Sequence, residues 1–356
     1  MYCENTKKQF ELLRNKKDAV ILGIESSCDE TAAAVVRGGK VVLSNIIASQ
    51  IEIHRRFGGV VPEVASRNHT LALPAVIDEA LKTANITARE LDAVAVTYGA
   101  GLIGALLVGV SAAKAYAYAI NKPLIAVNHI EAHVAANYIS EPSLTPPFAA
   151  LVASGGHTLL LDISDYNEYK MLGGTLDDAL GEAFDKVART VGLPYPGGPN
   201  VEKMAKEGNA NIAFFKHAKG VRGDLSLSYS GLKTAVVNYV NTLKQKGEEI
   251  PTADICASFT KEAIELLSKT ATEAVKRSGR NRLVLAGGVA SNGDLRCALA
   301  KEGEKNGFSV LYPPPVLCTD NAAMVASRAF FMARDGKGLA GLDLNAKSHI
   351  PFGGGK

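Results

Sequence analysis

The stretch AVILGIESSCDETAAAVV, residues 19–36, predicts two β-strands that are joined by a polar turn. Apolar residues fill both ends of this stretch, whereas residues 25–31, ESSCDET, are polar or small. Gly38-Gly39 follows as a tight turn, and residues 40–49 predict a third strand. The chain therefore begins as a three-stranded meander with a turn rich in hydroxyl and carboxylate groups.

The same order of strand, polar turn and strand returns in the second half of the chain. Residues 148–153 are an apolar strand, residues 154–158 (SGGHT) form a polar turn, and residues 159–163 predict a returning strand. Between the copies, EPSLTPP at residues 141–147 interrupts regular structure. Two such copies predict a two-lobed α/β fold, duplicated around a cleft that binds ligands at its turns. The expected divisions are an N-terminal extension, a first lobe, a second lobe, and a closing helix that returns to the first lobe with the C-terminal tail: residues 1–18, 19–145, 146–319 and 320–356.

The spacing of apolar residues, with glycine and proline as breaks, predicts the remaining elements. Strands are expected at residues 93–97, 123–127 and 283–286. Helices are expected at residues 68–84, 129–138, 172–191, 252–278 and 320–334, and residues 99–104 open a further helix of small residues that runs to about residue 120.

The composition of the 356 residues narrows the class of protein. With 47% hydrophobic and 21% charged residues, the chain is typical of a globular enzyme with two cores. A net charge of +3 means that any contact with RNA has to be local. The five cysteines are scattered without a C-x-x-C pair, which favours a reducing compartment. No apolar run approaches about 18 residues, so we expect no membrane span and a cytoplasmic protein whose first 18 residues are a short polar appendage.

His129 and His133 are four residues apart in the predicted helix 129–138, so both imidazoles lie on one face and could reach one metal ion. Two histidines that are merely packed or solvated remain the alternative. Glu131 follows two residues after His129, roughly 200° around a helix that turns about 100° per residue. Glu131 therefore points away from the metal, which disfavours a zinc protease because its general base would be missing.

Asp320 is the candidate third ligand. A carboxylate suits a metal that keeps an open position for a carboxylate or acyl oxygen of a substrate. Asp320 follows the stiff Pro313-Pro314-Pro315 segment and precedes the last predicted helix. It could equally be the N-cap of that helix.

Three glycine- or hydroxyl-rich turns could bind phosphate. Residues 26–31 and 154–158 offer backbone N–H groups and hydroxyls at matched positions in the two lobes, and residues 287–292, GGVASN, follow a predicted strand. The phosphate-binding motifs G-x-x-x-x-G-K-[ST] and G-x-G-x-x-G are absent in the required context. Asp185 belongs to an acidic run of the kind that usually marks a solvated helix face, but the stiff loop YPGGP, residues 195–199, follows it and could press its backbone against a ribose or base.

Nine motifs in a fixed order resemble the tRNA threonylcarbamoyladenosine transferase family, and the resemblance as a whole spans about residues 21–334. They are GIESSCDET (23–31), GGVVPEVASRNH (58–69), NHIEAH (128–133), SGGHT (154–158), GEAFDKVA (181–188), YPGGP (195–199), SYSGLKTA (228–235), AGGVASN (286–292) and CTDNAAM (318–324).

The resemblance implies the actin/Hsp70/sugar-kinase fold, one iron or zinc ion, and transfer of threonylcarbamoyl from its adenylate to the adenosine 3′ of the anticodon in tRNAs that read codons beginning with A. ATP or ADP is an alternative occupant of the same cleft. The implied partners are tRNA, a paralogue without the metal site, and a small ATPase, as in bacterial members.

The resemblance also assigns roles to particular residues. The implied metal ligands are His129, His133 and Asp320, and the implied acids that assist transfer are Asp29 and Glu30. Archaeal and eukaryotic relatives add a tyrosine to the metal shell where this chain has Val152. The residues implied to contact the adenylate are Val152, Ala153, Ser154, Gly155, Gly156, Asp185, Gly198, Glu202 and Asn292.

Three rival functions are considered. A small-molecule kinase of the same fold would use Mg²⁺ on carboxylates and phosphates, which paired imidazoles do not suit. A metalloprotease is disfavoured by the position of Glu131. A non-enzymatic scaffold paralogue would be expected to lack the intact set of metal ligands.

Overall fold

Each of the two polar turns joins a pair of antiparallel strands. The computed structural model describes residues 2–210, 212 and 223–350. In it, β1 (Val20–Glu25) pairs antiparallel with β2 (Glu30–Arg37) and parallel with β4 (Ala93–Gly99). In the same way, β6 (Phe148–Ala153) pairs antiparallel with β7 (Thr158–Asp165) and parallel with β10 (Arg282–Ala286). The duplication expected from the sequence is confirmed.

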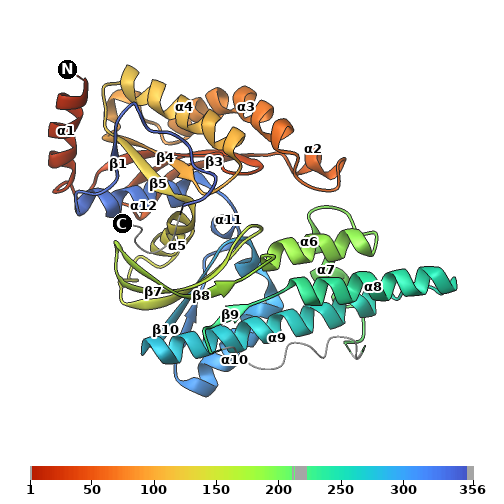
Figure 1. The fold of residues 1–356 in the computed structure, drawn as a ribbon. Helices are drawn as coiled ribbons and strands as arrows, with labels where there is room; N and C mark the ends of the chain where they lie inside the picture. Colours follow the sequence, from red (N-terminus) through yellow and green to blue (C-terminus); the bar gives the residue numbers. More distant parts are fainter. Residues whose placement is uncertain (1, 211, 213–222, 351–356) are drawn as a thin grey trace.

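The strands form two six-stranded sheets with matching order (Figure 1). The first sheet has the order β12-β5-β4-β1-β2-β3 and the second has the order β11-β10-β6-β7-β8-β9. Without the short edge strands β12 and β9, each sheet is a meander of three strands extended by two parallel strands. The further strands are β3 (Val41–Ser49), β5 (Leu124–Asn128), β8 (Glu168–Thr175), β9 (Ser226–Leu227), β11 (Ser309–Leu311) and β12 (Leu339–Ala340).

Helices cover both faces of each sheet, and two of them lie between the sheets (Figure 1). α3 and α4 pack on the outer face of the first sheet, and α6 to α10 pack on the outer side of the second. α5 and α12 share one apolar core with strands of both sheets. The helices are α1 (Tyr2–Leu13), α2 (Ile51–Arg55), α3 (Pro62–Thr83), α4 (Ile103–Ala119), α5 (His129–Ser140), α6 (Leu180–Thr190), α7 (Gly197–Ala205), α8 (Ser230–Lys246), α9 (Thr252–Ser278), α10 (Gly293–Asn306), α11 (Pro315–Cys318) and α12 (Ala322–Arg334).

We call the first sheet with α1 to α4 the first lobe, and the second sheet with α6 to α10 the second lobe. α12 follows the strands of the second lobe along the chain, yet it packs on β1 and β2 of the first. Gly23 of β1 permits this approach, because a Cβ at this position would lie 2.3 Å from the carbonyl oxygen of Ala322.

The N-terminal segment is more than the polar appendage that its composition indicates. Its residues form α1, whose Phe10 and Leu13 are buried in the core that also contains Phe330. The Tyr2 hydroxyl donates to the carbonyl oxygen of Lys122. The helix was overlooked because its apolar partners come from the other end of the chain.

The helix predicted over residues 172–191 is wrong in its first half. Residues 168–175 form β8, in which Gly173 and Gly174 pair with Leu160 and Leu159 of β7. α6 begins at Leu180. The apolar spacing continued through the boundary, whereas the glycine pair, which favours close backbone pairing over a helix, marked the strand.

The predicted divisions include residues 1, 211, 213–222 and 351–356, which lie outside the described residues. Among the residues that are described, no helix has the length and apolar character needed to cross a membrane.

Candidate metal centre

Both histidines of the NHIEAH motif lie in the first helical turns after β5. The Asn128 side chain caps α5 by accepting a hydrogen bond from the backbone N–H of Ile130. His129 and His133 are both buried, and their ring centroids are 4.5 Å apart. The local sequence therefore places two imidazoles on one face of a capped helix.

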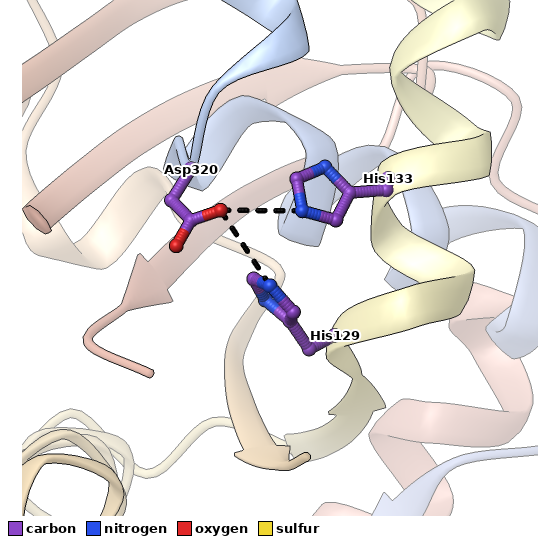
Figure 2. A group of neighbouring side chains, drawn as sticks. All are labelled: His129, His133 and Asp320. Atoms are coloured by element: carbon purple, nitrogen blue, oxygen red, sulfur yellow. Dashed lines mark ion pairs between the residues drawn. The ribbon is translucent and has the colours of Figure 1, made fainter. Parts of the chain in front are cut away.

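Asp320 reaches the same point from the segment between α11 and α12 (Figure 2). Its Oδ1 atom lies 3.2 Å from Nε2 of His133 and 3.5 Å from Nε2 of His129. The alternative interpretation of Asp320 as a helix cap is wrong, because α12 begins at Ala322 and its N-cap is Asn321, whose side chain accepts from Met324 N. The carboxylate of Asp320 is thus free to face the histidines.

These three side chains fit a metal ion. Two ligand atoms that each lie about 2.0–2.2 Å from one metal are roughly 3–3.5 Å apart, which agrees with the spacing of the Nε2 and Oδ1 atoms. Neither ring nitrogen of His133 has a well-directed hydrogen bond among the described residues, although this side chain is fully buried. Two imidazoles and a carboxylate are ligands that suit iron or zinc.

The protonation of this group also favours a cation. Burial, and next the charge of His129, lower the pKa of His133, so its ring is neutral and can donate a lone pair. Against the effect of burial, the carboxylates of Asp320 and Glu25 raise the pKa of His129, and the charge of His129 lowers the pKa of Asp320. A positive charge among these side chains is therefore stabilised, whether a proton or a metal supplies it.

Glu25 is the residue that the sequence analysis missed. It is fully buried at the end of β1 and accepts hydrogen bonds from the backbone N–H of Ser27 and the hydroxyl of Thr97. Its Oε2 atom also lies 3.1 Å from Nδ1 of His129. A carboxylate on the far nitrogen of a ligand imidazole fixes the ring and its tautomer, so that Nε2 faces the metal.

We therefore predict that Glu25→Gln weakens metal binding about 10- to 100-fold, because the charge that orients His129 is lost while the shape of the side chain is kept. Competition with a chromophoric chelator measures the affinity. Asp29→Asn, on the same turn, is the matched control and should leave the affinity unchanged. Equal affinity of the wild type and Glu25→Gln would refute the role of Glu25.

Glu131 points away from the metal ligands, as its position in the helix predicts. Its carboxylate forms an ion pair of 2.6 Å with the guanidinium of Arg328, which is buried in α12. Arg328 also donates to the carbonyl oxygen of Tyr166. Glu131 is thus a structural link between α5 and α12. It does not occupy the position that the general base has in a zinc protease.

The two acids of the first polar turn have different environments. Asp29 is buried and accepts a hydrogen bond of 3.0 Å from the hydroxyl of Tyr195. Glu30 accepts from the hydroxyl of Ser49 through one oxygen, and burial raises its pKa to about 7. Near neutral pH, Glu30 can therefore either hold or accept a proton.

The raised pKa of Glu30 predicts a pH-dependent effect on stability. Ionisation of Glu30 is disfavoured in the folded state and therefore lowers the free energy of unfolding. This loss is absent below the unfolded-state pKa, near 4.5, and reaches its full size above a pH of about 7. Glu30→Gln removes this loss. The free energy of unfolding of Glu30→Gln minus that of the wild type should therefore increase by roughly 1–2 kcal/mol from pH 4.5 to pH 8, allowing for solvent screening.

Urea denaturation of both proteins at the two pH values, with EDTA present, measures this difference. Ser49→Ala, which removes the hydroxyl but keeps the carboxylate, should not show the same gain at pH 8. Identical pH dependence of the wild type and Glu30→Gln would contradict the assignment.

The second polar turn lies next to the metal ligands. Burial, followed by the charges of His129 and His133, lowers the pKa of His157 to about 4. Ser154 closes the turn by exchanging hydrogen bonds with the backbone of His157. Of the residues that the resemblance places on the adenylate, Val152 and Ala153 are buried in β6, whereas Gly155 and Gly156 are exposed.

The other residues placed on the adenylate surround this turn in two groups. Glu202 and Asn292 meet at the start of α10, where Glu202 accepts from the backbone N–H of Gly293 and Asn292 caps the helix. Asp185 accepts from the backbone N–H of Gly197 and also interacts with that of Gly198. α6, which carries Asp185, also lies against the turn at residues 154–158. A Cβ on its Gly181 would lie only 2.6 Å from the carbonyl oxygen of Ser154.

Two sheets with the same strand order and with polar turns at matched positions define a protein of the actin/Hsp70/sugar-kinase-like fold. Two solved structures share this fold at low identity. Full-length HypF in its phosphate- and nucleotide-bound form has a TM-score of 0.60 and 16% identity, covering 90% of this chain and 47% of that one. The activator of the 2-hydroxyisocaproyl-CoA dehydratase from Clostridium difficile, with bound ADPNP, has a TM-score of 0.52 and 14% identity, covering 89% and 96%.

Within this class, the chain belongs to the tRNA N6-adenosine threonylcarbamoyltransferase family, whose sequence model matches residues 41–327. Curated relatives with that name include a protein of Clostridium perfringens strain SM101, 55% identical over 95% of this chain and 99% of its own length. Another, from Clostridium novyi strain NT, is 54% identical over 95% and 99%. The family consists of transferases that act on tRNA, so a small-molecule kinase is not favoured.

Proposed function

We propose that this chain transfers a threonylcarbamoyl group from threonylcarbamoyl-adenylate to the amino nitrogen of the adenosine 3′ of the anticodon, in tRNAs that read codons beginning with A, and releases AMP. The observation that carries the proposal is the convergence of His129, His133 and Asp320 beside the turn at residues 154–158, in a chain 55% identical to a relative named for this transfer.

The proposed metal is a divalent iron or zinc ion held by Nε2 of His129, Nε2 of His133 and a carboxylate oxygen of Asp320. When bound, such a metal supplies a Lewis acid to an oxygen of the acyl group. The protein's own contribution is the orientation of the ligands: Glu25 fixes the ring of His129, and Asn128 fixes the start of α5. Metal analysis by mass spectrometry distinguishes iron from zinc.

The adenylate is proposed to lie along the second lobe, between the turn at residues 154–158 and α7. Exposed backbone N–H groups of Gly155 and Gly156, with the N-terminus of α6 beside them, suit the phosphate. Asp185 and Gly198 would contact the ribose, while Asn292 and Glu202 would bound the base. ATP or ADP would occupy the same surface as competitors.

In the transfer step, the adenosine amine forms a bond to the carbamoyl carbon while the bond from that carbon to the phosphate oxygen breaks. The amine loses a proton, and AMP leaves with the bonding electrons. Glu30 is the proposed proton acceptor, because its pKa of about 7 lets it take a proton at neutral pH. The phosphate-binding turn stabilises the charge that grows on the leaving group.

A reconstituted reaction tests the function. Purified protein is incubated with threonine, bicarbonate, ATP, the adenylate-forming enzyme and tRNA, with and without the partner proteins, and the nucleosides are analysed by mass spectrometry. A tRNA with guanosine in place of the target adenosine is the matched control. Absence of the modified nucleoside from the complete mixture with unmodified tRNA would refute the proposal.

The proposed protein partners are a paralogue without the metal site and a small ATPase. α3 and α4 form an open groove of about 840 Å³, lined mainly by apolar side chains such as Leu73, Ile77 and Leu107. Leu107 is 42% exposed and the nearby Leu71 is 79% exposed. An exposed apolar groove of this kind favours a protein contact, and we assign it to the paralogue.

If so, Leu107→Asp should weaken association with the paralogue at least about tenfold, because a charge would be buried at the centre of the contact. Leu12→Asp on α1, where the side chain is 74% exposed, is the matched control and should bind normally. Isothermal titration calorimetry measures both. Equal affinities would assign the paralogue to another surface.

We propose four divisions of the chain. Residues 19–145 contribute the histidines and the acidic pair, residues 146–319 contribute the adenylate surface, and residues 320–356 contribute Asp320, while residues 1–18 act only as a packed extension. The five cysteines are free thiols, which supports the cytoplasm as the proposed compartment.

A further inference from the structure

Tyr195, in the loop between α6 and α7, is held by the first lobe at two points. Its hydroxyl donates to Oδ2 of Asp29 at 3.0 Å. Its backbone carbonyl accepts from Nε of Arg55, the last residue of α2, at 3.1 Å. Two separate elements of the first lobe therefore bind Tyr195 of the second lobe, one through its side chain and the other through its backbone.

The loop that carries Tyr195 is fixed to its own lobe. Asn200 donates to the carbonyl oxygens of Pro194 and Pro196, on both sides of the tyrosine. Asp185 accepts from the N–H of Gly197 at 2.6 Å, and a Cβ on Gly197 would lie only 2.5 Å from Cα of Asp185. Tyr195 thus projects from a braced loop, and a movement of the second lobe would be transmitted to Asp29.

The first lobe receives Tyr195 at a point that is tied to the acidic turn. The carbonyl oxygen of Asp29 accepts from the N–H of Gln50, immediately before α2, so the turn and α2 form one unit. Burial, and next the charge of Asp29, raise the pKa of Tyr195, which keeps the hydroxyl protonated as a donor. Glu30, the proposed proton acceptor, directly follows Asp29 in the same turn.

We infer that Tyr195 is a positioning residue for the transfer: through Asp29 it holds the turn that carries Glu30 at a fixed place relative to the adenylate surface of the second lobe. The inference rests on the proposed function. Tyr195 acts through Asp29, to which its hydroxyl donates.

The first experiment measures transfer kinetics of Tyr195→Phe, which keeps the ring and removes only the donor. We expect kcat to fall about tenfold with the KM for tRNA nearly unchanged, since misplacement of a reacting group affects the chemical step. Tyr312→Phe, which also loses only a hydroxyl and lies over Arg296, should keep the wild-type kcat. A wild-type kcat for Tyr195→Phe would overturn the inference.

A double-mutant cycle tests whether Tyr195 acts through Asp29. In an Asp29→Ala background, where the acceptor of the Tyr195 hydroxyl is gone, Tyr195→Phe should change kcat by less than about twofold. Full additivity of the two substitutions would overturn the inference. Arg55→Ala should lower kcat in the same way as Tyr195→Phe, whereas Arg56→Ala, which removes an equal charge one residue further on, should not.

Hydrogen–deuterium exchange provides a readout that does not depend on activity. In Tyr195→Phe, exchange should become faster in peptides covering residues 25–31 and 194–198, and it should stay unchanged in Tyr312→Phe. If the wild type transfers nothing to tRNA, the proposed function fails, while faster exchange still establishes the contact. If the wild type is active and Tyr195→Phe keeps the wild-type kcat, the inference alone fails.

Discussion

His129→Ala is expected to lose stoichiometric metal binding and to lower the rate of threonylcarbamoyl transfer at least about a thousandfold. The remaining His133 and Asp320 provide only two protein ligands, and the loss of a Lewis acid removes several kcal/mol of stabilisation from the transition state. Elemental analysis by mass spectrometry and the nucleoside assay measure the two effects on the same preparation.

Leu12→Ala, on a side chain of α1 that is 74% exposed, is the control and should keep both metal and activity. The melting temperatures of the metal-free wild type and of His129→Ala should be compared, so that unfolding is separated from ligand loss. Full transfer by a metal-free His129→Ala protein would refute the assignment of the ligands.

Glu131→Ala is expected to lower the free energy of unfolding by about 3 kcal/mol without changing the metal content. The substitution leaves the buried guanidinium of Arg328 without its carboxylate. The loss should lie at the lower end for a buried ion pair, because the Glu131 side chain is 23% exposed and Arg328 keeps its bond to Tyr166. Urea denaturation measures the change.

Two variants sharpen this result. Glu131→Gln, which keeps a hydrogen-bonding side chain, should lose less stability, and Glu131→Ala with Arg328→Met should recover part of the loss because no charge remains buried. At a temperature where each protein is folded, transfer should stay within a fewfold of the wild-type rate. A large loss of transfer in folded Glu131→Gln would mean that this carboxylate takes part in chemistry after all.

The repeated strand and turn pattern was sufficient to predict the duplicated sheets, because each copy combines two local signals, an apolar run and a polar break. The register of β6 and β7 confirms the second copy residue by residue. The histidine pair was predictable for the same reason, since the four-residue spacing acts within one helix. Where a single segment carries both the signal and its partner, the sequence is informative.

The contacts that the sequence did not reveal join distant segments. Glu25 appeared to be the first polar residue of a turn, and nothing nearby indicated that it would meet Thr97 and His129. α1 appeared polar because its two buried residues, Phe10 and Leu13, depend on a core that includes α12. The boundary of β8 was missed because strand pairing decides it, and pairing is a property of two segments.

The position of α12 has a consequence for the synthesis of the protein on the ribosome. The face of the first sheet that receives α12 is built from residues 20–128, but its cover consists of residues 322–334. The second sheet and its helices are completed by residue 311, before that cover has been translated. The first lobe is therefore made first but finishes folding last. Until α12 has been translated, the apolar face of the first sheet is uncovered, and the nascent chain must be shielded from aggregation.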